Sequence, residues 1–401
     1  MTDTPAPNGT RKLAIVGLLL TLTLLGVFPI DVVLPSFPAL SEHLGRPSSD
    51  IALSVSLFVV GIALSQLLIG PLSDVMGRKN LLLIGLIVSV IGAIGCVLAD
   101  DYWLFLLFRV VQALGCGCFV LSQALIQDLF TGHEQQRLRI LLVTCGGLFI
   151  SVSPLAGTGL QTWMGWRGSF LVFVALAVGV MLSVALLLGS SPTDRQRRPT
   201  DFIASYRKVC GAFSFMAYWL TSAFAFSCHF SFIVISPLIL IDQLHLSPEA
   251  FAWTLLGYGL AYIGGGAVAT VLGTRLDSQT QILIGMGLIL TAGVSMLGLC
   301  VHLGLSLTTL LLPMIVCTAG TTIARAAANT QAMSIFPEQA GTSASVGSVL
   351  IFIIGGLTSG LLSLTPLDLQ TTLALCLISL SLVGLVLSGL LRHRHETLLV
   401  G

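Results

Sequence analysis

The chain has 401 residues, of which 55% are hydrophobic and only 9% are charged, and its formal net charge is +1. Soluble globular proteins carry roughly a quarter charged residues, and a soluble fold could not bury this much apolar surface. The small net charge gives no reason to expect a nucleic-acid partner. Because lipid offers no partner to backbone polar groups, we expect an all-α membrane protein.

Twelve apolar runs are long enough to be membrane-spanning helices, because a helix needs about 20 residues to cross the hydrocarbon core. The first run is too long for a cleavable signal peptide, and no small-residue cleavage site follows it. The twelve predicted spans cover residues 12–34, 51–72, 80–99, 102–127, 137–160, 168–189, 211–235, 250–272, 280–301, 305–330, 341–364 and 370–391.

The 18 Lys and Arg residues are distributed unevenly between the predicted loops. With the N-terminus placed in the cytoplasm, the cytoplasmic segments hold 14 of them, and the outer loops hold only two, Arg46 and Arg167. The remaining two lie inside predicted spans. Since basic residues favour the cytoplasmic side, this asymmetry predicts that both termini are cytoplasmic.

The first span contains Asp31, one of four ionisable residues that lie inside apolar runs. A charge at the centre of a membrane helix costs about 3 kcal/mol on insertion scales, so such a residue is a functional candidate. At about 1.5 Å per residue, Asp31 lies about 30 Å from Arg11 and could instead sit at the outer interface. The apolar run continues past Leu34, which favours a buried position.

The second and third spans are joined by Gly70–Lys79, which reads GPLSDVMGRK. A link this short requires antiparallel helices and places one acid and two bases at the membrane surface, as an ordinary positive-inside loop would. The string also resembles the signature loop of the major facilitator superfamily, a family of membrane transporters, from which only Val75 departs. The matching motif positions include Gly70, Asp74, Gly77, Arg78 and Lys79.

The fourth and fifth spans carry two further resemblances to that family. Arg109–Gly115 reads RVVQALG, similar to its fourth-helix R-x-x-Q-G motif, and Gln112 lies one helical turn beyond Arg109 on the same face. Ser151–Gly159 reads SVSPLAGTG, similar to the antiporter motif G-P-x-x-G-G of drug/proton exporters. The motif positions Pro154 and Gly157 would allow a bend and close helix packing, and generic packing is the alternative.

The polar segment Ser190–Lys208 divides the chain nearly in half. Gly70-x3-Asp74 recurs as Gly273-x3-Asp277 after the eighth span, 203 residues later, and internal repeats of this kind are expected in secondary transporters. We therefore predict an N-terminal six-helix bundle at 1–189, a cytoplasmic linker at 190–209 and a C-terminal six-helix bundle at 210–401.

Loops elsewhere are short and leave no room for a catalytic or nucleotide-binding domain. The chain has no GxxxxGK[ST] motif. Its nine Cys residues lie in or at the ends of apolar runs without a C-x-x-C pair. We therefore expect a protein that is not an enzyme and that has no cofactor and no metal. Uphill transport would have to draw on an ion gradient.

The seventh and tenth spans hold the other two ionisable residues, His229 and Arg325. His229 could be a packing histidine with satisfied hydrogen bonds. Arg325 precedes the small and polar run 326–331, which suggests a helix that faces a cavity. The alternative is that the Arg325 side chain snorkels toward the cytoplasm.

Two more segments narrow the resemblance to the bicyclomycin/chloramphenicol-resistance (Bcr/CflA) exporters. Ile30–Pro38 reads IDVVLPSFP, similar to the first-helix D-x-x-L-P-x-x-P signature of that subfamily. Phe336–Ser345 reads FPEQAGTSAS, similar to its F-P-x-x-A-G-T-A-S-A junction between the tenth and eleventh helices. The resemblance covers nearly the whole chain. It implies proton-coupled export across the bacterial inner membrane by alternating access.

In the major facilitator fold, helices one, four, seven and ten line the central cavity, and these are the helices that carry the four ionisable residues. The resemblance then implies that Asp31 binds the proton, that Arg109 tunes its pKa from nearby, and that the Gly70–Lys79 loop latches the cytoplasmic side. Substrate would bind near Gln112, His229 and Arg325.

Because the cavity helices hold one acid and two arginines, we expect neutral polar or anionic substrates, such as a drug, siderophore or metabolite. The expected partners are this substrate, protons and membrane lipid, and the protein is expected to be a monomer. A facilitator or importer of a nucleoside-like or amino-acid-like metabolite on the same fold is the alternative.

Overall fold

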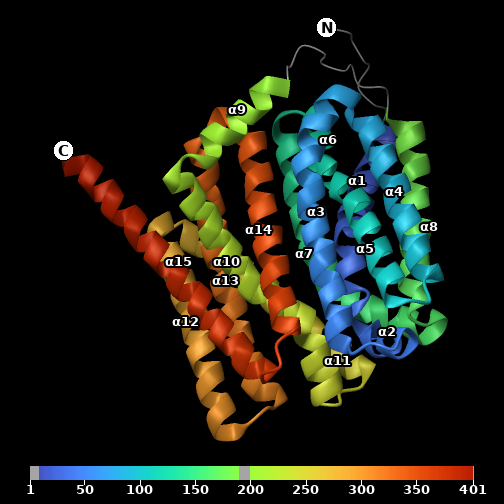
Figure 1. Cartoon of the computed structure of the whole chain (residues 1–401). Helices are drawn as coiled ribbons and strands as arrows, with labels where there is room; N and C mark the ends of the chain where they lie inside the picture. The colour runs from blue at the N-terminus through green and yellow to red at the C-terminus, as the bar shows by residue number, and fades with distance from the viewer. Residues whose placement is uncertain (1–8, 189–198, 401) are drawn as a thin grey trace.

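Helices make up nearly all of the protein in the computed structural model, which describes residues 9–188 and 199–400 (Figure 1). No strand occurs within those two ranges. The all-α prediction is therefore confirmed, and Figure 1 shows the long helices standing side by side in two groups.

Within residues 9–188 the elements are α1 (Gly9–Asp31), η1 (Leu34–Ser36), α2 (Phe37–Leu44), α3 (Ser48–Met76), α4 (Arg78–Leu98), α5 (Tyr102–Cys116), η2 (Gly117–Val120), α6 (Leu121–Leu129), α7 (Gly132–Met164) and α8 (Arg167–Leu187). Within residues 199–400 they are α9 (Pro199–Cys210), α10 (Phe213–Pro237), η3 (Leu238–Gln243), α11 (Pro248–Gly273), α12 (Ser278–Leu303), α13 (Leu307–Ile335), η4 (Pro337–Gln339), α14 (Ala340–Ser363) and α15 (Leu369–Val400).

The described helices include 11 that are long and apolar enough to cross a membrane. They correspond to the predicted spans except the fifth, 137–160. That segment also lies in a helix, α7, which is 33 residues long and packs against α1 and α11. The side chains at 139, 140, 143 and 144 lie outside the described part of the structure, so the count of 11 does not include this helix.

Three of the predicted spans are interrupted helices. The first span continues beyond α1 through η1 and α2, the fourth through η2 and α6, and the seventh through the π-helical turn η3. Proline explains the first break, because Pro35 cannot donate the backbone hydrogen bond that the Asp31 carbonyl would accept in a regular helix. α1 accordingly ends at Asp31.

The two groups of helices share one packing pattern. In the first group α4 packs against α5 and α8, and α1 packs against α7 and α8. In the second group α12 packs against α13 and α15, and α10 packs against α14 and α15. The groups meet where α3 packs on α14 and α7 packs on α11. The domain boundaries predicted at 189/190 and 209/210 remain a prediction, since residues 190–198 lie outside the described ranges.

Small residues bring equivalent helices together in both groups. A Cβ atom added at Gly85 of α4 would lie 2.9 Å from the Gly115 carbonyl oxygen of α5. In the second group a Cβ atom added at Gly320 of α13 would lie 2.5 Å from the Gly285 carbonyl oxygen of α12. Close backbone approach through small residues is a common packing mode of membrane helices.

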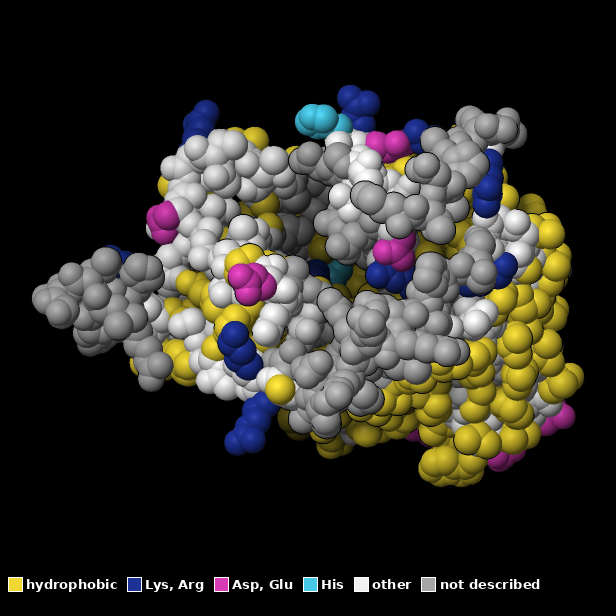
Figure 2. Space-filling model, turned by 90° about the horizontal axis from the view of Figure 1, so that it is seen from above, with side chains coloured by type: hydrophobic (Ala, Val, Ile, Leu, Met, Phe, Trp, Pro, Cys, Tyr) yellow, Lys and Arg dark blue, Asp and Glu magenta, His cyan; other side chains and the backbone are white. Residues whose placement is uncertain are grey.

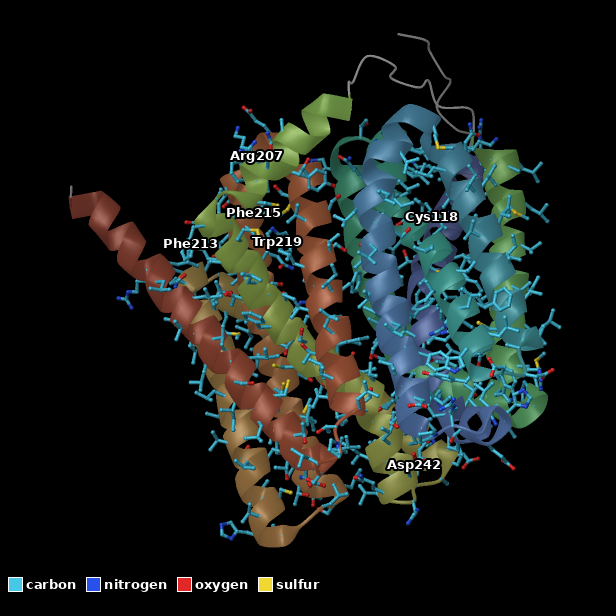
Figure 3. All side chains as sticks on the ribbon, viewed as in Figure 1. Cys118, Arg207, Phe213, Phe215, Trp219 and Asp242 are labelled. Atoms are coloured by element: carbon cyan, nitrogen blue, oxygen red, sulfur yellow. The ribbon has the colours of Figure 1, made fainter. Side chains whose placement is uncertain are left out.

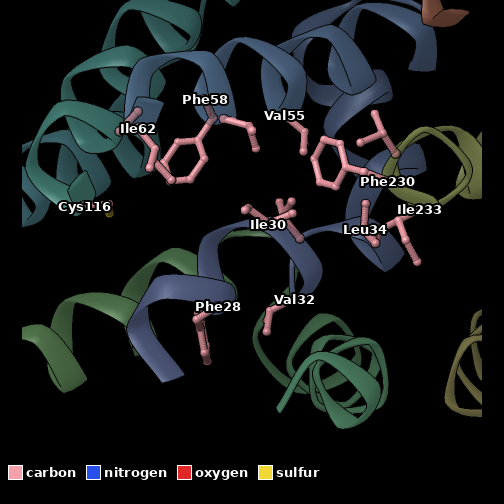
Figure 4. Close-up of a cluster of buried hydrophobic side chains, with 14 of the residues drawn as sticks. Phe28, Ile30, Val32, Leu34, Val55, Phe58, Ile62, Cys116, Phe230 and Ile233 are labelled. Atoms are coloured by element: carbon pink, nitrogen blue, oxygen red, sulfur yellow. The ribbon is translucent and has the colours of Figure 1, made fainter. Parts of the chain in front are cut away.

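At the end of the fold that holds η1, apolar side chains from both groups close the space between them. Figure 4 shows Leu34, Val55, Phe230 and Ile233 gathered there, and all four belong to one buried cluster. A hydrogen bond also crosses between the groups at the same end, because the Thr158 hydroxyl shares its proton between the Pro154 carbonyl of its own helix and the Pro248 carbonyl, which is 3.3 Å away.

The opposite end is hollowed. Figure 2 looks onto the upper end of Figure 1 and shows a hollow between the two groups, with Lys or Arg and His side chains visible inside it. The structure is therefore open toward the end that carries α9 and sealed by apolar side chains toward η1.

The helix α9 docks on α10 and α14 at the open end. Its Val209 joins a second buried cluster with Phe215, Trp219 and Val346, and Figure 3 shows Phe215 and Trp219 close to Phe213 and Arg207. Burial raises the pKa of Tyr206, and a hydrogen bond with Ser345 partly opposes that shift. The part of the predicted linker that is described, 199–209, is therefore a docked helix.

Candidate functional site

The four ionisable residues predicted inside the membrane lie on four different helices, α1, α5, α10 and α13. Asp31, Arg109 and His229 are 5%, 1% and 7% exposed, and Arg325 is half-buried. Asp31 is thus enclosed by protein, as the functional interpretation requires, and does not lie on the outer surface of the fold.

Arg109 is held by two hydrogen bonds and two aromatic rings. One terminal nitrogen donates to the Gln112 side-chain oxygen at 2.9 Å, and the other donates to the Pro29 carbonyl at 3.1 Å. The guanidinium carbon lies 4.1 Å from the ring centroid of Phe58 and 5.8 Å from that of Phe170. Cation–π contacts and charge-assisted hydrogen bonds together make a buried guanidinium tolerable.

The Pro29 carbonyl is available because α1 ends two residues later. The last carbonyls of a helix have no partner within the helix and carry its negative partial charge. A cation is favourable at this position, so Arg109 of α5 caps the C-terminal end of α1. The spacing of Arg109 and Gln112 predicted their shared face, and their hydrogen bond confirms it.

Asp31 lies two residues from this cap, but among the described residues no ion pair joins its carboxylate to Arg109. No hydrogen bond to the Asp31 carboxylate is recorded within the same part of the chain. A direct effect of Arg109 on the Asp31 proton therefore remains a prediction. The contact that the structure records between these elements runs through the Pro29 carbonyl.

The predicted antiporter motif lies against the turn that follows Asp31. A Cβ atom added at Gly157 of α7 would lie 2.3 Å from the Val32 carbonyl oxygen, and Ser169 of α8 donates to the same oxygen at 3.4 Å. Pro154 lies inside α7, and its carbonyl accepts a hydrogen bond from the Thr158 hydroxyl at 3.1 Å. Gly157 thus allows α7 to contact the end of α1.

His229 belongs to a hydrogen-bonded cluster in the second group of helices. Its Nδ1 lies 2.6 Å from the Tyr258 hydroxyl and 3.3 Å from the Thr318 hydroxyl, and Thr318 donates to Tyr258 at 2.5 Å. The imidazole stacks on Tyr258 with ring centroids 5.2 Å apart and lies 4.9 Å from Tyr262. The cluster fixes the orientation of both tyrosine rings.

Arg325 lies beside that cluster. Its guanidinium donates to the Tyr262 hydroxyl at 3.2 Å and lies 4.8 Å from the ring centroid of Phe226. Its Nε is buried and has no hydrogen-bond partner among the described residues. The contacts with Tyr262 and Phe226 hold the guanidinium between helices, which favours the cavity interpretation over snorkelling.

The structure therefore assembles two clusters from the predicted residues. Gln112 joins Arg109 in the first group of helices, whereas His229 and Arg325 share Tyr262 in the second. Sequence reasoning missed Phe226, Tyr258, Tyr262 and Thr318. One signal was available, because the eighth span holds two of the chain's five tyrosines four residues apart, on one helix face.

The predicted loop at 70–79 is mostly helical. Gly70 and Asp74 lie in α3, which continues to Met76, and Gly77 alone separates it from α4. Gly77 has φ +81°, a conformation that favours glycine. The side chain of Asp74 lies outside the described part of the structure, so its latch role stays a prediction.

The two basic residues of this motif tie α4 to neighbouring elements. Arg78 pairs with Asp128 of α6, with the closest nitrogen and oxygen 2.6 Å apart, and it also donates to the Ala124 carbonyl. Lys79 donates to the Leu188 carbonyl at 2.6 Å at the end of α8. Asp128 is a further residue that the sequence motif did not predict.

Within the described ranges, no three His, Cys, Asp or Glu side chains gather closely enough to hold a metal ion. A guanidinium, several hydroxyl groups and several aromatic rings lie beside the hollow and are available to a small molecule. Such groups can bind a ligand by hydrogen bonds and ring contacts.

Comparisons with known proteins place these features in a family. The family model of the Major Facilitator Superfamily matches residues 19–360. The chain is 26% identical over 395 residues to the MFS-type transporter YdgK of Bacillus subtilis (strain 168), covering 97% of this chain and 98% of that protein. It is 28% identical over 383 residues to a chloramphenicol resistance protein of Pseudomonas aeruginosa, covering 94% and 90%.

A solved structure has the same fold. The D-xylose-proton symporter superposes with a TM-score of 0.75 at 14% sequence identity, over 93% of this chain and 97% of that chain. The superposition confirms the fold class that the sequence predicted.

Proposed function

The chain belongs to the major facilitator superfamily of membrane transporters, and on that premise we propose that it exports a small molecule from the cytoplasm in exchange for protons. Export would take place across the bacterial inner membrane by alternating access. The similarity to a chloramphenicol resistance protein supports drug export. We also propose that the protein is a monomer, that it needs no cofactor, and that the proton gradient supplies its energy.

The half-buried Arg325 is the single observation that carries the choice of substrate. Among the described residues no carboxylate pairs with it, and one of its guanidinium donors has a recorded partner. A fixed positive charge in a site of low dielectric attracts anions and acceptor groups and repels cations. We therefore propose neutral polar or anionic substrates, with Arg325 contacting the acceptor group.

Proton coupling is assigned to Asp31. It is buried at the end of α1, where Arg109 of α5 and Gly157 of α7 both contact the adjoining backbone. A change in the charge of Asp31 would act at the end of α1, where α5 and α7 pack against it. This location supports the proposal that protonation changes how α1 packs against α5 and α7.

The apolar cluster at the η1 end and the hollow at the other end support alternating access. We assign the hollow end to the cytoplasm, because α9 and both termini are predicted to lie there. In this state a substrate would enter from the cytoplasm, and the cluster around Leu34 and Phe230 would separate it from the outside.

The test is transport by the purified protein in proteoliposomes, with chloramphenicol as the first probe. Uptake into inside-out oriented vesicles is expected to rise when the lumen is made acidic and to fall when a protonophore removes the gradient. If the uptake of chloramphenicol does not depend on the proton gradient while counterflow proceeds at a normal rate, the protein is a facilitator.

A further inference from the structure

Arg325 contacts Phe226 and Tyr262, which belong to a set of aromatic side chains that lie in two layers. Phe230, His229 and Tyr258 are buried, at 6%, 7% and 3% exposure, whereas Phe226, Tyr262 and Phe352 are half-buried. The buried layer supports the half-buried one, because His229 fixes Tyr258 and Tyr262 by ring contacts.

Phe226 places its ring against the Arg325 guanidinium. Its ring is stacked on Phe230 with centroids 5.2 Å apart and an interplanar angle of 12°. Arg325 lies 4.8 Å from the Phe226 centroid, while Phe352 meets the ring edge-on at 75°. Tyr262 anchors one end of the guanidinium by accepting a hydrogen bond. Phe226 and Tyr262 are therefore positioning residues for Arg325.

The remaining guanidinium donors have no recorded partner within the described residues. A guanidinium is planar and presents paired N–H groups that match the two oxygens of a carboxylate. A half-buried guanidinium without an acid partner is unfavourable unless a ligand or solvent satisfies it. The geometry thus provides a place for an anionic, planar acceptor group.

The half-buried rings of Tyr262 and Phe352 add a second requirement for the ligand, which concerns the shape of its apolar part. Pairs of aromatic rings in edge-to-face or offset-stacked arrangements are stabilised beyond the burial of their area, a gain that a saturated group of the same size does not provide. A molecule whose carboxylate met Arg325 would place its body against these rings. We propose that Arg325, Tyr262 and Phe352 bind flat aromatic molecules that carry a carboxylate or an equivalent anionic group. This inference rests on the proposed export function and names the substrate class of its site.

The test is binding to the purified full-length protein by isothermal titration calorimetry, with 2-naphthoate as the probe. Three comparison compounds change one property each: 2-naphthylmethanol lacks the charge, decalin-2-carboxylate lacks the flat ring, and 2-naphthyltrimethylammonium reverses the charge. 2-Naphthoate is expected to bind about tenfold more tightly than the first two, and the cation is expected not to bind.

Substitutions locate the site. Arg325→Gln is expected to weaken 2-naphthoate binding about tenfold, to the level of 2-naphthylmethanol, and Arg325→Lys is expected to recover only part of it. Phe352→Leu is expected to remove the advantage of 2-naphthoate over the saturated acid. Arg275→Gln, a change of the same charge at an exposed position, is the matched control.

Equal binding of 2-naphthoate and 2-naphthylmethanol, or unchanged binding in a folded Arg325→Gln variant, would overturn the inference. Size-exclusion profiles and melting temperatures show which variants are folded, and Arg325→Lys carries the test if Arg325→Gln does not fold. Proton-driven efflux is measured separately. Loss of selective binding with intact efflux of chloramphenicol removes this inference alone, whereas selective binding without gradient-driven transport removes the proposed function alone.

Discussion

Arg109 shows how a buried charge can connect elements that are distant in the sequence. Its guanidinium joins Gln112 on its own helix to the Pro29 carbonyl, 80 residues earlier. Removing the side chain would leave a buried carbonyl without a partner, which costs about 1–3 kcal/mol. The contact is therefore structural as well as electrostatic, and it lies within two residues of Asp31.

At the residue scale the first prediction concerns Asp31. Asp31→Asn removes the titratable group but keeps a side chain of similar size, so gradient-driven accumulation is expected to fall to the level of protein-free liposomes. Counterflow of substrate is expected to remain, because the Arg325 cluster lies in the other group of helices. Both are measured with the same proteoliposomes under an imposed pH gradient.

The matched control for this prediction is Asp242→Asn. Asp242 is an exposed carboxylate at the opposite end of the fold from α9 (Figure 3), so the same chemical change is expected to leave accumulation unchanged. If Asp31→Asn vesicles still concentrate substrate against a gradient, Asp31 is not the proton carrier.

The sequence predicted those site residues whose presence in a membrane span costs free energy, because a charge inside an apolar run is unfavourable unless it has a role. Charged residues in apolar runs stand out, and a spacing of three residues was enough to pair Arg109 with Gln112. Tyr262 and Phe226 were not found, because aromatic residues are ordinary in membrane helices and their relation to Arg325 arises only when α10, α11 and α13 pack together. The partner of Arg109 on α1 could not be predicted either, since it is a backbone carbonyl exposed by the end of a helix.

At the element scale α7 depends on the absence of a side chain at one position. A Cβ atom at Gly157 would lie 2.3 Å from the Val32 carbonyl oxygen, whereas one at Gly159 would meet nothing within 4 Å. Gly157→Ala is therefore expected to lower stability by about 1–3 kcal/mol through overpacking. Gly159→Ala is expected to be neutral or slightly stabilising, because alanine favours helix.

The measurement for both alanine variants is the thermal melting temperature in detergent, together with transport in proteoliposomes. Gly157→Ala is expected to lose transport as well, because α7 can no longer contact the end of α1. Equal melting temperatures and rates for the two variants would show that the close approach of α7 to Val32 has no energetic consequence.

The motif at 70–79 forms the junction of α3 and α4. Asp74→Asn is expected to slow turnover by about tenfold, equivalent to about 1.4 kcal/mol in the transport barrier, with near-normal expression. The physical reason is that a carboxylate opposite a helix N-terminus or a basic group stabilises one closed state and not the fold itself. Initial rates of counterflow and the yield of folded protein measure the two effects.

Asp128→Asn serves for comparison, because it weakens the Arg78 pair at the other side of the same junction. Both partners of this pair are partly exposed, and pairs of this kind contribute about 0–1 kcal/mol. A large loss of folded Asp74→Asn protein, with the rate per folded molecule unchanged, would contradict the latch role.

Element boundaries show a further limit of the sequence. The length of each apolar run predicted that a span exists, and within the described residues all twelve runs are mainly helical. Hydropathy could not predict that the first, fourth and seventh spans are interrupted, or that α3 continues through most of the expected loop at 70–79. Only the proline at Pro35 and the glycine at Gly77 carried local signals for these ends.

At the scale of the whole molecule the two groups of helices meet along α3 with α14 and α7 with α11. Alternating access requires the apolar cluster at the η1 end to open while the hollow at the other end closes. The direct contact of Ser56 with Ser359, whose hydroxyl oxygens are 2.8 Å apart across the groups, lies in this interface. It offers a place to lock the two groups together.

The last prediction uses that contact. Because the two side chains already touch, cysteines at both positions are expected to form a disulfide under mild oxidation and to stop transport nearly completely. Binding of 2-naphthoate from the hollow side is expected to persist, since the lock holds the observed state. Treatment with dithiothreitol is expected to restore transport, which is followed as counterflow in proteoliposomes before and after reduction.

The nine native cysteines require a control, which is the parent chain and each single variant, Ser56→Cys or Ser359→Cys, carried through the same oxidation. These are expected to keep their rates. Disulfide formation is measured by the mobility of the protein after cleavage with a protease between the two groups of helices. A cross-linked double variant that transports at the parent rate would show that α3 and α14 need not separate here. Access to the outside would then have to arise elsewhere in the interface.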